Sequence, residues 1–316
     1  MTPSTFDPAE TRARLWQLLG DIPAPMTPQV ELLSRRAEPT YALEHFRFVN
    51  GLGDAVYGYL LLPRDIDYPA PAVLYHHEHG GKYSLGKDAA LRIRENGYAP
   101  GIALAEAGFV VCAIDAYGFG RREHEGPGGK SETGRETETS LFKQFLWQGR
   151  TLWGMMLHDD RCALAYLRSR SEVDASRIGT AGMSLGGSRS TWLAALDESV
   201  KAVAPISQMT RYADFAAQGE YRRHAIYYYV PGMLASGLDM EHIVACTAPR
   251  SQLILTGDSD PLSPLSGIHA IMDYARAVYA DFGAADKLDL TLYEGVGHAY
   301  LPDMLRRMLA FFSRVL

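Results

Sequence analysis

The feature that most constrains the fold is a glycine-rich junction near the middle of the chain. Residues 178–183 read Ile-Gly-Thr-Ala-Gly-Met, a short apolar run, and Ser184 follows directly with Leu185-Gly186-Gly187 after it. Glycines two places before and after a serine let a strand turn sharply into a helix, because a Cβ at either place would meet neighbouring backbone. The turn strains the serine backbone and lifts its hydroxyl clear of a sheet edge. We therefore interpret Ser184 as a candidate nucleophile.

The same junction supplies a candidate hydrogen-bond donor. A helix that begins directly after Ser184 would aim the Leu185 N–H at the point where a reacting oxygen sits, and a helix N-terminus favours negative charge there. Taken alone, the five-residue pattern is also compatible with an ordinary strand–helix turn that carries a solvent-facing serine. The choice between the two depends on partners elsewhere in the chain.

The rest of the chain indicates an α/β fold. Helical stretches separate most of six short apolar runs, at residues 72–77, 109–115, 178–183, 202–206, 252–256 and 288–293. Continuous apolar strands that alternate with helices are typical of a parallel sheet covered on both faces. Residues 41–50 and 55–63 instead alternate as an antiparallel hairpin. We predict an α/β-hydrolase fold, with a mostly parallel central sheet, an antiparallel N-terminal hairpin and helices on both faces.

We expect residues 1–316 to form a single domain, since no repeat, low-complexity tract or linker is visible. Residues 1–40 are predicted to form a helical N-terminal arm, with an amphipathic helix over 8–20 that Asp7 caps. Residues 117–140 are interpreted as a surface loop and residues 140–169 as one long helix. Residues 207–249 separate two strands by more than a crossover helix and are interpreted as an insertion that shapes a pocket.

Two later segments supply partners for the serine in the order Ser, acid, His. Asp258 and Asp260 follow the run at 252–256, and His298 follows the run at 288–293 in a glycine-rich loop. The carboxyl ends of parallel strands meet at one sheet edge, so these groups should converge on Ser184. We assign His298 as the base and Asp260 as the acid that orients it, with Asp258 as the rival. Each alone could be an ordinary loop residue.

The run at 72–77 leads into a loop that should hold the second oxyanion donor. We assign that donor to the backbone N–H of His79, with Gly80 next to it. A metal site built on His77, Glu78 and His79 is an alternative, but the spacing matches no zinc motif, and we expect neither metal nor cofactor. In a structural alternative the histidines brace the loop and Glu78 pairs with a cation: Lys82, Arg121 or Arg122.

Other acids that could resemble catalytic groups are assigned structural roles. Asp115 precedes the serine, so the expected order excludes it, and we expect it to cap loop N–H groups. Asp174 is interpreted as a turn acid, and Asp159 and Asp160 as an exposed or salt-bridged pair on a helix face rather than a carboxylate dyad.

Composition excludes several classes of partner. The net charge is −6 and no basic stripe is present, so we expect no nucleic acid partner. No apolar run reaches the ~20 residues of a membrane span. The first ten residues carry no basic-then-apolar signal region, so we expect a cytoplasmic protein, with a homo-oligomer left open. The three cysteines are scattered and are interpreted as core thiols.

Beyond these patterns, several stretches resemble one family. They are His-Glu-His-Gly-Gly at 77–81, Leu-Gly-Lys-Asp at 85–88, Ala-Ile-Asp-Ala-Tyr-Gly-Phe-Gly-Arg at 113–121, Val-Asp-Ala-Ser-Arg-Ile-Gly at 173–179, the elbow, Tyr-Tyr-Val-Pro-Gly at 228–232 and Ala-Pro-Arg at 248–250. Together they resemble dienelactone hydrolase-like α/β-hydrolases, in the branch related to acetyl xylan esterases. Two departures stand out: dienelactone hydrolase proper has a cysteine nucleophile where this chain has Ser184, and related proteins tend to have Gly or Asp where it has Glu78.

The resemblance implies hydrolysis of small-molecule esters, often of short acyl groups on sugars. With it, we predict a serine esterase that acts through an acyl-enzyme, with Gly80, Tyr228 and Tyr229 as candidate pocket residues. Two alternatives stay open. One is a peptidase of the prolyl oligopeptidase type, although no propeller of repeated strands precedes the domain. The other is a hydrolase-fold binding protein that has lost turnover.

Overall fold

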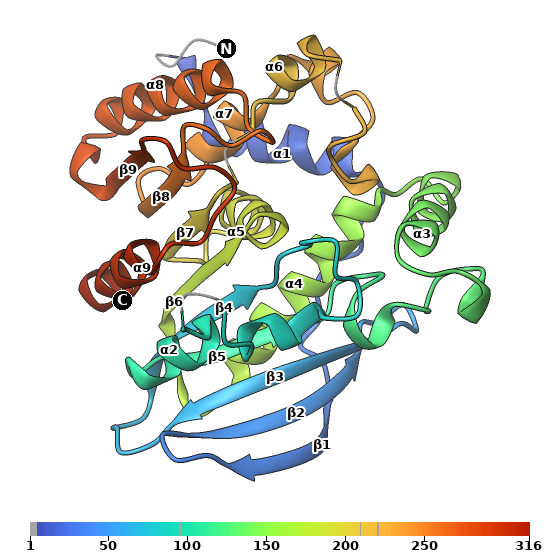
Figure 1. The fold of residues 1–316 in the computed structure, drawn as a ribbon, viewed down its shortest axis with the longest axis vertical. Coiled ribbons are helices and arrows are strands. Elements are labelled where there is room, and N and C mark those ends of the chain that lie inside the picture. The colour runs from blue at the N-terminus through green and yellow to red at the C-terminus, as the bar shows by residue number, and fades with distance from the viewer. Residues whose placement is uncertain (1–4, 95–96, 209, 220) are drawn as a thin grey trace.

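The computed structural model describes residues 5–94, 97–208, 210–219 and 221–316, and its centre is one sheet of nine strands (Figure 1). The strands lie in the order β1-β2-β3-β5-β4-β6-β7-β8-β9. Their bounds are β1 Val30–Ala37, β2 Tyr41–Val49, β3 Ala55–Pro63, β4 Ala70–His76, β5 Val110–Ile114, β6 Val173–Met183, β7 Ala202–Ile206, β8 Ser251–Gly257 and β9 Leu288–Tyr293. Strands β4 to β9 pair in parallel, and all six correspond to the predicted apolar runs.

The antiparallel edge of the sheet is larger than predicted. The expected hairpin forms β2 and β3, but β1 pairs with β2 outside it, and β3 pairs antiparallel with β5. The prediction of a helical arm over 1–40 is therefore wrong for Val30–Ala37, and residues 1–4 lie outside the described residues. Seven of the eight residues of β1 are exposed, so this edge strand has no buried face to impose an alternating pattern.

Helices cover both faces of the sheet (Figure 1). The longer ones are α1 Pro8–Leu19, α2 Pro100–Glu106, α3 Arg135–Trp147, α4 Leu152–Ser169, α5 Leu185–Leu196, α8 Leu265–Asp281 and α9 Pro302–Val315; α6 Tyr212–Ala217 and α7 Met240–Ala245 are short. Helices α1, α4, α5, α7 and α8 contribute to one buried cluster and α2 and α9 to the other. Asp7 caps α1 as predicted, accepting from the N–H groups of Ala9 and Glu10. Cys112, Cys162 and Cys246 are free and buried.

The predicted long helix over 140–169 is two helices, α3 and α4, and α3 begins inside the stretch that was interpreted as a loop. Gly149 has a φ of +74°, a left-handed conformation that ends the first helix. Thr151 then starts the second, its side chain accepting a hydrogen bond from the Gly154 N–H at 3.0 Å. Only four residues, 148–151, separate the two helices, and both helices are apolar on their inner faces, so periodicity alone does not reveal the break. None of the helices in the described ranges combines the length and apolar character that crossing a bilayer requires.

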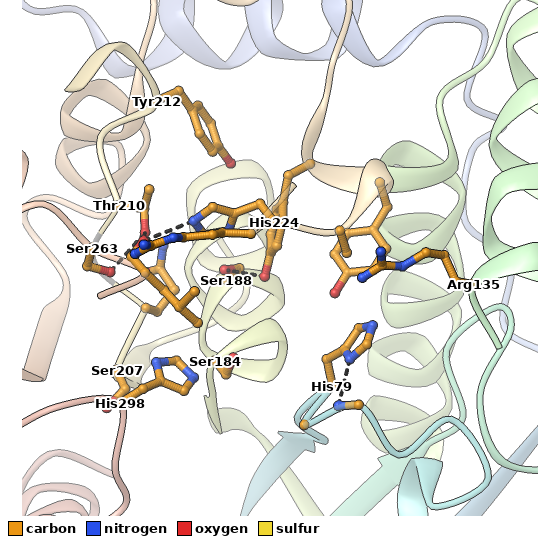
Figure 2. Close-up of a pocket in the computed structure, with 18 residues that line it drawn as sticks. His79, Arg135, Ser184, Ser188, Ser207, Thr210, Tyr212, His224, Ser263 and His298 are labelled. Atoms are coloured by element: carbon orange, nitrogen blue, oxygen red, sulfur yellow. Dashed lines mark hydrogen bonds between the residues drawn. The ribbon is translucent and has the colours of Figure 1, made fainter. Parts of the chain in front are cut away.

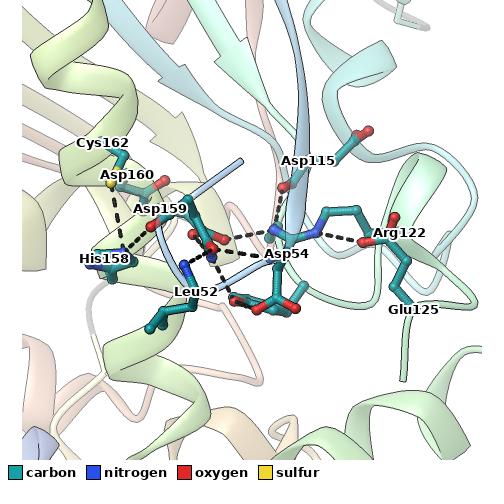
Figure 3. Close-up of polar contacts among 12 residues, drawn as sticks. Leu52, Asp54, Asp115, Arg122, Glu125, His158, Asp159, Asp160 and Cys162 are labelled. Carbon is teal, nitrogen blue, oxygen red and sulfur yellow. Dashed lines mark hydrogen bonds and ion pairs between the residues drawn. The ribbon is translucent and has the colours of Figure 1, made fainter. Parts of the chain in front are cut away.

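Buried ion pairs on α4 connect the elements behind the site. The Arg122 Nη1 lies 2.7 Å from Asp159 Oδ2, and Figure 3 shows this guanidinium between Asp159 and Glu125. Asp160 pairs with Arg189 of α5, whose Nε lies 3.0 Å from Asp160 Oδ2. The two aspartates therefore form salt bridges as expected, but they are buried, not exposed.

Replacing Asp160 with asparagine is expected to lower the free energy of unfolding by about 3–5 kcal/mol, because the buried Arg189 charge would lose its partner. Burial by itself would raise the pKa of Asp160, but attraction from Arg189, with His76 adding to it, outweighs burial and holds that pKa below its usual range. The difference in unfolding free energy between variant and wild type should therefore be complete at pH 7 and become smaller as the pH falls below about 4. Urea unfolding at pH 7 and at a pH below 4 measures this difference. The control is Asp273→Asn, which removes a charge from an exposed pair with Arg276 and should leave the stability at the wild-type value.

Candidate active site

The serine junction has the geometry that its glycines predict. Ser184 follows β6 with φ +56° and ψ −119°, a strained conformation for a residue with a side chain, and α5 starts directly after it. A Cβ on Gly182 would lie 2.4 Å from the His76 carbonyl oxygen, and one on Gly186 would lie 2.1 Å from the same atom. Only glycine therefore fits on either side of Ser184, and β4 is the strand that enforces it.

The predicted acid and base lie in contact. His298 Nδ1 lies 2.7 Å from Asp260 Oδ2, and the other oxygen of Asp260 accepts from the Leu262 N–H at 2.9 Å. Asp260 is buried, so its carboxylate is held between these two donors. An ionised carboxylate only accepts, so Nδ1 of His298 carries the proton and Nε2 has a free lone pair. The rival Asp258 instead accepts from the Gly295 N–H at 2.8 Å, across the turn.

Ser184 and His298 line one cavity of about 330 Å³ (Figure 2). Many of the residues that line this cavity follow β4, β6, β7, β8 and β9, whose carboxyl ends share one sheet edge. Figure 2 shows Ser184 between His298 on one side and His79 on the other. Within the described part of the chain, no hydrogen bond joins the Ser184 hydroxyl to His298.

The loop after β4 is braced by its own histidine. The Nδ1 of His79 accepts from the Gly81 N–H at 2.9 Å, and its Nε2 lies 3.5 Å from Glu138 Oε2. Gly80 and Gly81 both have positive φ, at +52° and +70°, so the backbone turns beside the cavity. The Leu185 N–H is in the first turn of α5, where backbone donors have no partner within the helix. His79 thus lines the same cavity as Ser184, and Leu185 directly follows Ser184 in the chain; their role as oxyanion donors stays a prediction.

Glu138 of α3 connects three elements around this loop. Besides its contact with His79, its carboxylate accepts from the Tyr83 hydroxyl at 2.9 Å and from the Ile226 N–H at 3.0 Å. One buried side chain therefore holds the loop after β4, helix α3 and the insertion together. No sequence motif marks Glu138, because the three partners come from distant parts of the chain.

The remaining members of the His/Glu cluster have structural roles. His77 is buried, accepts from the Ala116 N–H through Nε2 at 3.1 Å and contacts the Glu78 carbonyl through Nδ1. Burial lowers the pKa of His77 to about 3, with the nearby Arg189 charge adding to the effect. Glu78 pairs with Arg94 at 2.7 Å, not with the three cations predicted for it. Among the described residues, no group of three or more His, Cys, Asp or Glu side chains is arranged to hold a metal ion.

Asp115 has the role predicted for it, whereas Asp174, predicted to lie in a turn, lies near the start of β6. Asp115 is buried after β5 and accepts from the backbone N–H groups of Lys87 at 2.7 Å and Arg121 at 3.2 Å. Asp174 accepts from the Ser176 N–H at 2.9 Å, in the part of β6 where its register with β4 is irregular.

The three predicted pocket residues divide between two cavities. Gly80 and Tyr228 line the serine cavity, and the Tyr228 hydroxyl lies 3.1 Å from Ser188 Oγ. Tyr229 does not line it; its side chain faces a neighbouring cavity, where its hydroxyl donates to the Tyr221 carbonyl at 2.7 Å. Adjacent residues in an irregular segment point in different directions, which the sequence alone does not resolve. Residues 209 and 220 of the insertion lie outside the described residues.

Several lining residues were missed in the sequence. Ser188 lies one helical turn after Ser184 on the same face of α5, and Ser207 directly follows β7 at the same sheet edge, so spacing could have found both. No local pattern distinguishes the others, which include Arg135, Gln208, Thr210, Arg223 and His224.

A mostly parallel sheet, a serine at a sharp turn after a central strand, and a His–Asp pair beyond later strands together define the α/β-hydrolase fold. The sequence profile of the Dienelactone hydrolase family matches residues 56–307. The chain therefore belongs to the dienelactone hydrolase family. A lactone is a cyclic ester, so the chain is an enzyme of the carboxylic ester hydrolase class, as predicted.

Individual relatives agree with this assignment. The "Putative hydrolase YtaP" of Bacillus subtilis (strain 168) is 37% identical over 281 residues, which cover 88% of this chain and 90% of the relative. A glucuronoyl esterase from Solibacter usitatus has the same fold, with a TM-score of 0.69, 15% identity, and coverage of 98% of this chain and 92% of that one. Acetyl Xylan Esterase 1 from Thermoanaerobacterium sp. JW/SL YS485 has a TM-score of 0.65 and 18% identity, covering 98% and 93%. These two structures establish the fold.

Proposed function

We propose that the protein is a serine carboxylic-ester hydrolase that acts through an acyl-enzyme on short-acyl esters. The observation that carries the proposal is the convergence of three groups on one cavity: a strained serine, a histidine whose Nδ1 lies 2.7 Å from an aspartate, and a helix N-terminus. A serine hydroxyl needs a base to become a nucleophile, and an oriented imidazole is such a base.

In the first half-reaction Ser184 Oγ attacks the ester carbonyl carbon while His298 Nε2 takes the hydroxyl proton. The missing hydrogen bond between the two in the free protein does not oppose this step, because catalytic hydrogen bonds often form only with substrate bound. The carbonyl oxygen becomes an oxyanion, which the N–H groups of Leu185 and His79 stabilise. Asp260 keeps the imidazole in the required tautomer and stabilises the imidazolium.

The imidazolium of His298 then gives its proton to the alcohol oxygen, the bond from that oxygen to the carbonyl carbon breaks, and the alcohol leaves the acyl group on Ser184. Water attacks the acyl-enzyme in the second half-reaction, with His298 again accepting the proton and returning it to Ser184 Oγ. The products are the carboxylic acid and the free alcohol, and neither half-reaction uses a metal or cofactor.

The preference for short acyl groups is supported by the size of the cavity, about 330 Å³, which the alcohol portion must share. The name of the acetyl xylan esterase with the same fold points the same way. Polar side chains on the cavity wall, among them Gln208 and Arg135, suit an alcohol that carries hydroxyl groups close to the ester.

A series of p-nitrophenyl esters from acetyl to octanoyl tests the acyl preference. We expect kcat/KM to be highest for acetyl or propionyl and at least about 10-fold lower for octanoyl, because one surplus or missing methylene in a pocket changes it by about 10-fold or more. Equal rates along the series would contradict the short-acyl proposal while leaving the serine mechanism intact. Hydrolysis of none of these esters would contradict the proposed function itself.

A further inference from the structure

A second cavity, of about 390 Å³, lies inside the insertion next to the serine cavity. All of its described lining residues come from Tyr212–Ala235, a segment that the proposed chemistry does not use. Most of the lining is apolar or aromatic, and its larger side chains include Phe215, Tyr221, Tyr229, Val230, Met233 and Leu234. Tyr221 and Leu234 are exposed at 54% and 45%, so large apolar side chains at this cavity are open to solvent.

Three side chains line both cavities and so form the partition between them: Tyr212, His224 and Tyr228. The Tyr228 hydroxyl contacts Ser188, so the polar end of this ring points into the serine cavity and not into the second cavity. The His224 and Tyr228 rings meet edge to face, with centroids 5.6 Å apart. The two cavities are therefore adjacent, with these three side chains between them.

The second cavity offers almost nothing to a polar ligand. The Tyr229 hydroxyl is used by the Tyr221 carbonyl, and His224 Nε2 is used by the Leu262 carbonyl at 2.9 Å. Burial lowers the pKa of His224, so its ring is neutral near pH 7. No lining residue that the structure describes carries a charge at that pH. A sugar ring here would find few hydrogen-bond partners on the protein, whereas an alkyl or aryl group needs none.

The position of the partition indicates which half of an ester reaches it. His224 is bonded to Leu262, two residues after Asp260, so the partition is attached to the loop that carries the acid. Figure 2 shows His224 and Thr210 above Ser184 on the side of His298, with His79 on the opposite side. In the proposed mechanism His298 must protonate the alcohol oxygen, so the alcohol leaves on this side.

We propose that the second cavity is a binding subsite for an apolar alkyl or aryl group on the alcohol portion of the ester. This inference rests on the proposed function and narrows its substrate class to short-acyl esters whose alcohol carries an apolar end several atoms from the ester oxygen. The volume is sufficient, since an apolar cavity of about 150 Å³ already accepts a benzene ring.

Acetate esters of methanol, butanol, hexanol and 2-phenylethanol test the subsite with a constant acyl group. Each buried methylene improves transfer from water about fourfold, so kcat/KM for hexyl acetate should exceed that for methyl acetate by at least about 30-fold. Ala216 lines the second cavity on α6, and Ala216→Trp should fill it and reduce that ratio to within about threefold of unity. Ala217, the next residue, is exposed and is not a lining residue, so Ala217→Trp should behave as wild type.

Two kinetic outcomes would overturn the proposal. One is a wild-type rate that does not depend on the alcohol. The other is an Ala216→Trp variant that loses selectivity along an acyl series instead, which would assign the subsite to the acyl half.

A binding measurement separates the subsite from the chemistry. Ligand-observed NMR measures the binding of 2-phenylethanol. The Ser184→Ala variant should bind this alcohol, and the Ser184→Ala/Ala216→Trp variant should bind it at least about 10-fold more weakly. This result would support the subsite even if the wild-type protein hydrolysed no ester. Equal binding by the two variants, or binding by neither, would overturn the subsite whatever the fate of the proposed function.

Discussion

Replacing Ser184 with alanine should reduce kcat for p-nitrophenyl acetate by about 10⁵–10⁶-fold, leaving only the catalysis that the oxyanion donors and substrate binding supply. The reason is local: Ser184 is the hydroxyl at the strained turn, and a methyl group there cannot form an acyl-enzyme. The variant should fold normally, because the Ser184 N–H that donates to the Ile206 carbonyl is retained.

The matched control is Ser176→Ala, at the start of the same strand. The exposed Ser176 side chain donates to Asp174 and lies outside the cavity, so the kinetics of this variant should equal those of wild type. Mass spectrometry adds a second readout: a fluorophosphonate probe should label wild type at Ser184 and leave the variant unlabelled. Turnover by Ser184→Ala within about 10-fold of wild type would contradict the serine mechanism and favour a water-based reaction.

Much of the fold is predictable because its signals are local and strong. All six parallel strands were predicted from short runs rich in apolar residues, because strands covered on both faces are mostly apolar. The turn at Ser184 was predicted for a different reason: the His76 carbonyl leaves no room for a Cβ on Gly182 or Gly186, so the chain must have glycines there. The chain order of serine, acid and base follows from the same topology.

The errors lie where burial imposes no pattern or where two patterns join. Strand β1 is exposed along nearly its whole length, so nothing in residues 30–37 alternates. The break between α3 and α4 depends on the conformation of Gly149, which many helices tolerate as an ordinary interior residue at a cost of about 1 kcal/mol. In both cases the tertiary structure decides what local propensity leaves open.

The site is predictable in its chemical core and not in its walls. Ser184, Asp260 and His298 each follow a strand, so topology alone brings them to one edge. Glu138 and His224 act through contacts with segments far away in sequence, so no local sequence pattern predicts their roles. The difference between Tyr228 and Tyr229 is a difference of one residue in an irregular segment, which periodicity cannot resolve.

Replacing Asp260 with asparagine is expected to lower kcat by about 10⁴-fold with a small change in KM. Asparagine fits the same space, but its amide can turn its NH₂ group toward His298 Nδ1, which stabilises the tautomer with the proton on Nε2. That tautomer cannot accept the Ser184 proton, and the imidazolium also loses its counter-charge. Steady-state kinetics with p-nitrophenyl acetate measure the effect.

Asp258→Asn is the matched control, because Asp258 is the rival acid in the same turn. Its carboxylate bonds the Ser259 hydroxyl and the Gly295 N–H, so asparagine can keep an acceptor there, and kcat should stay within about threefold of wild type. A large loss for Asp258→Asn with little loss for Asp260→Asn would reverse the assignment of the acid. His298 contacts Asp260, at 2.7 Å, and does not contact Asp258. Such a reversal would therefore require the loop after β8 to rearrange during turnover.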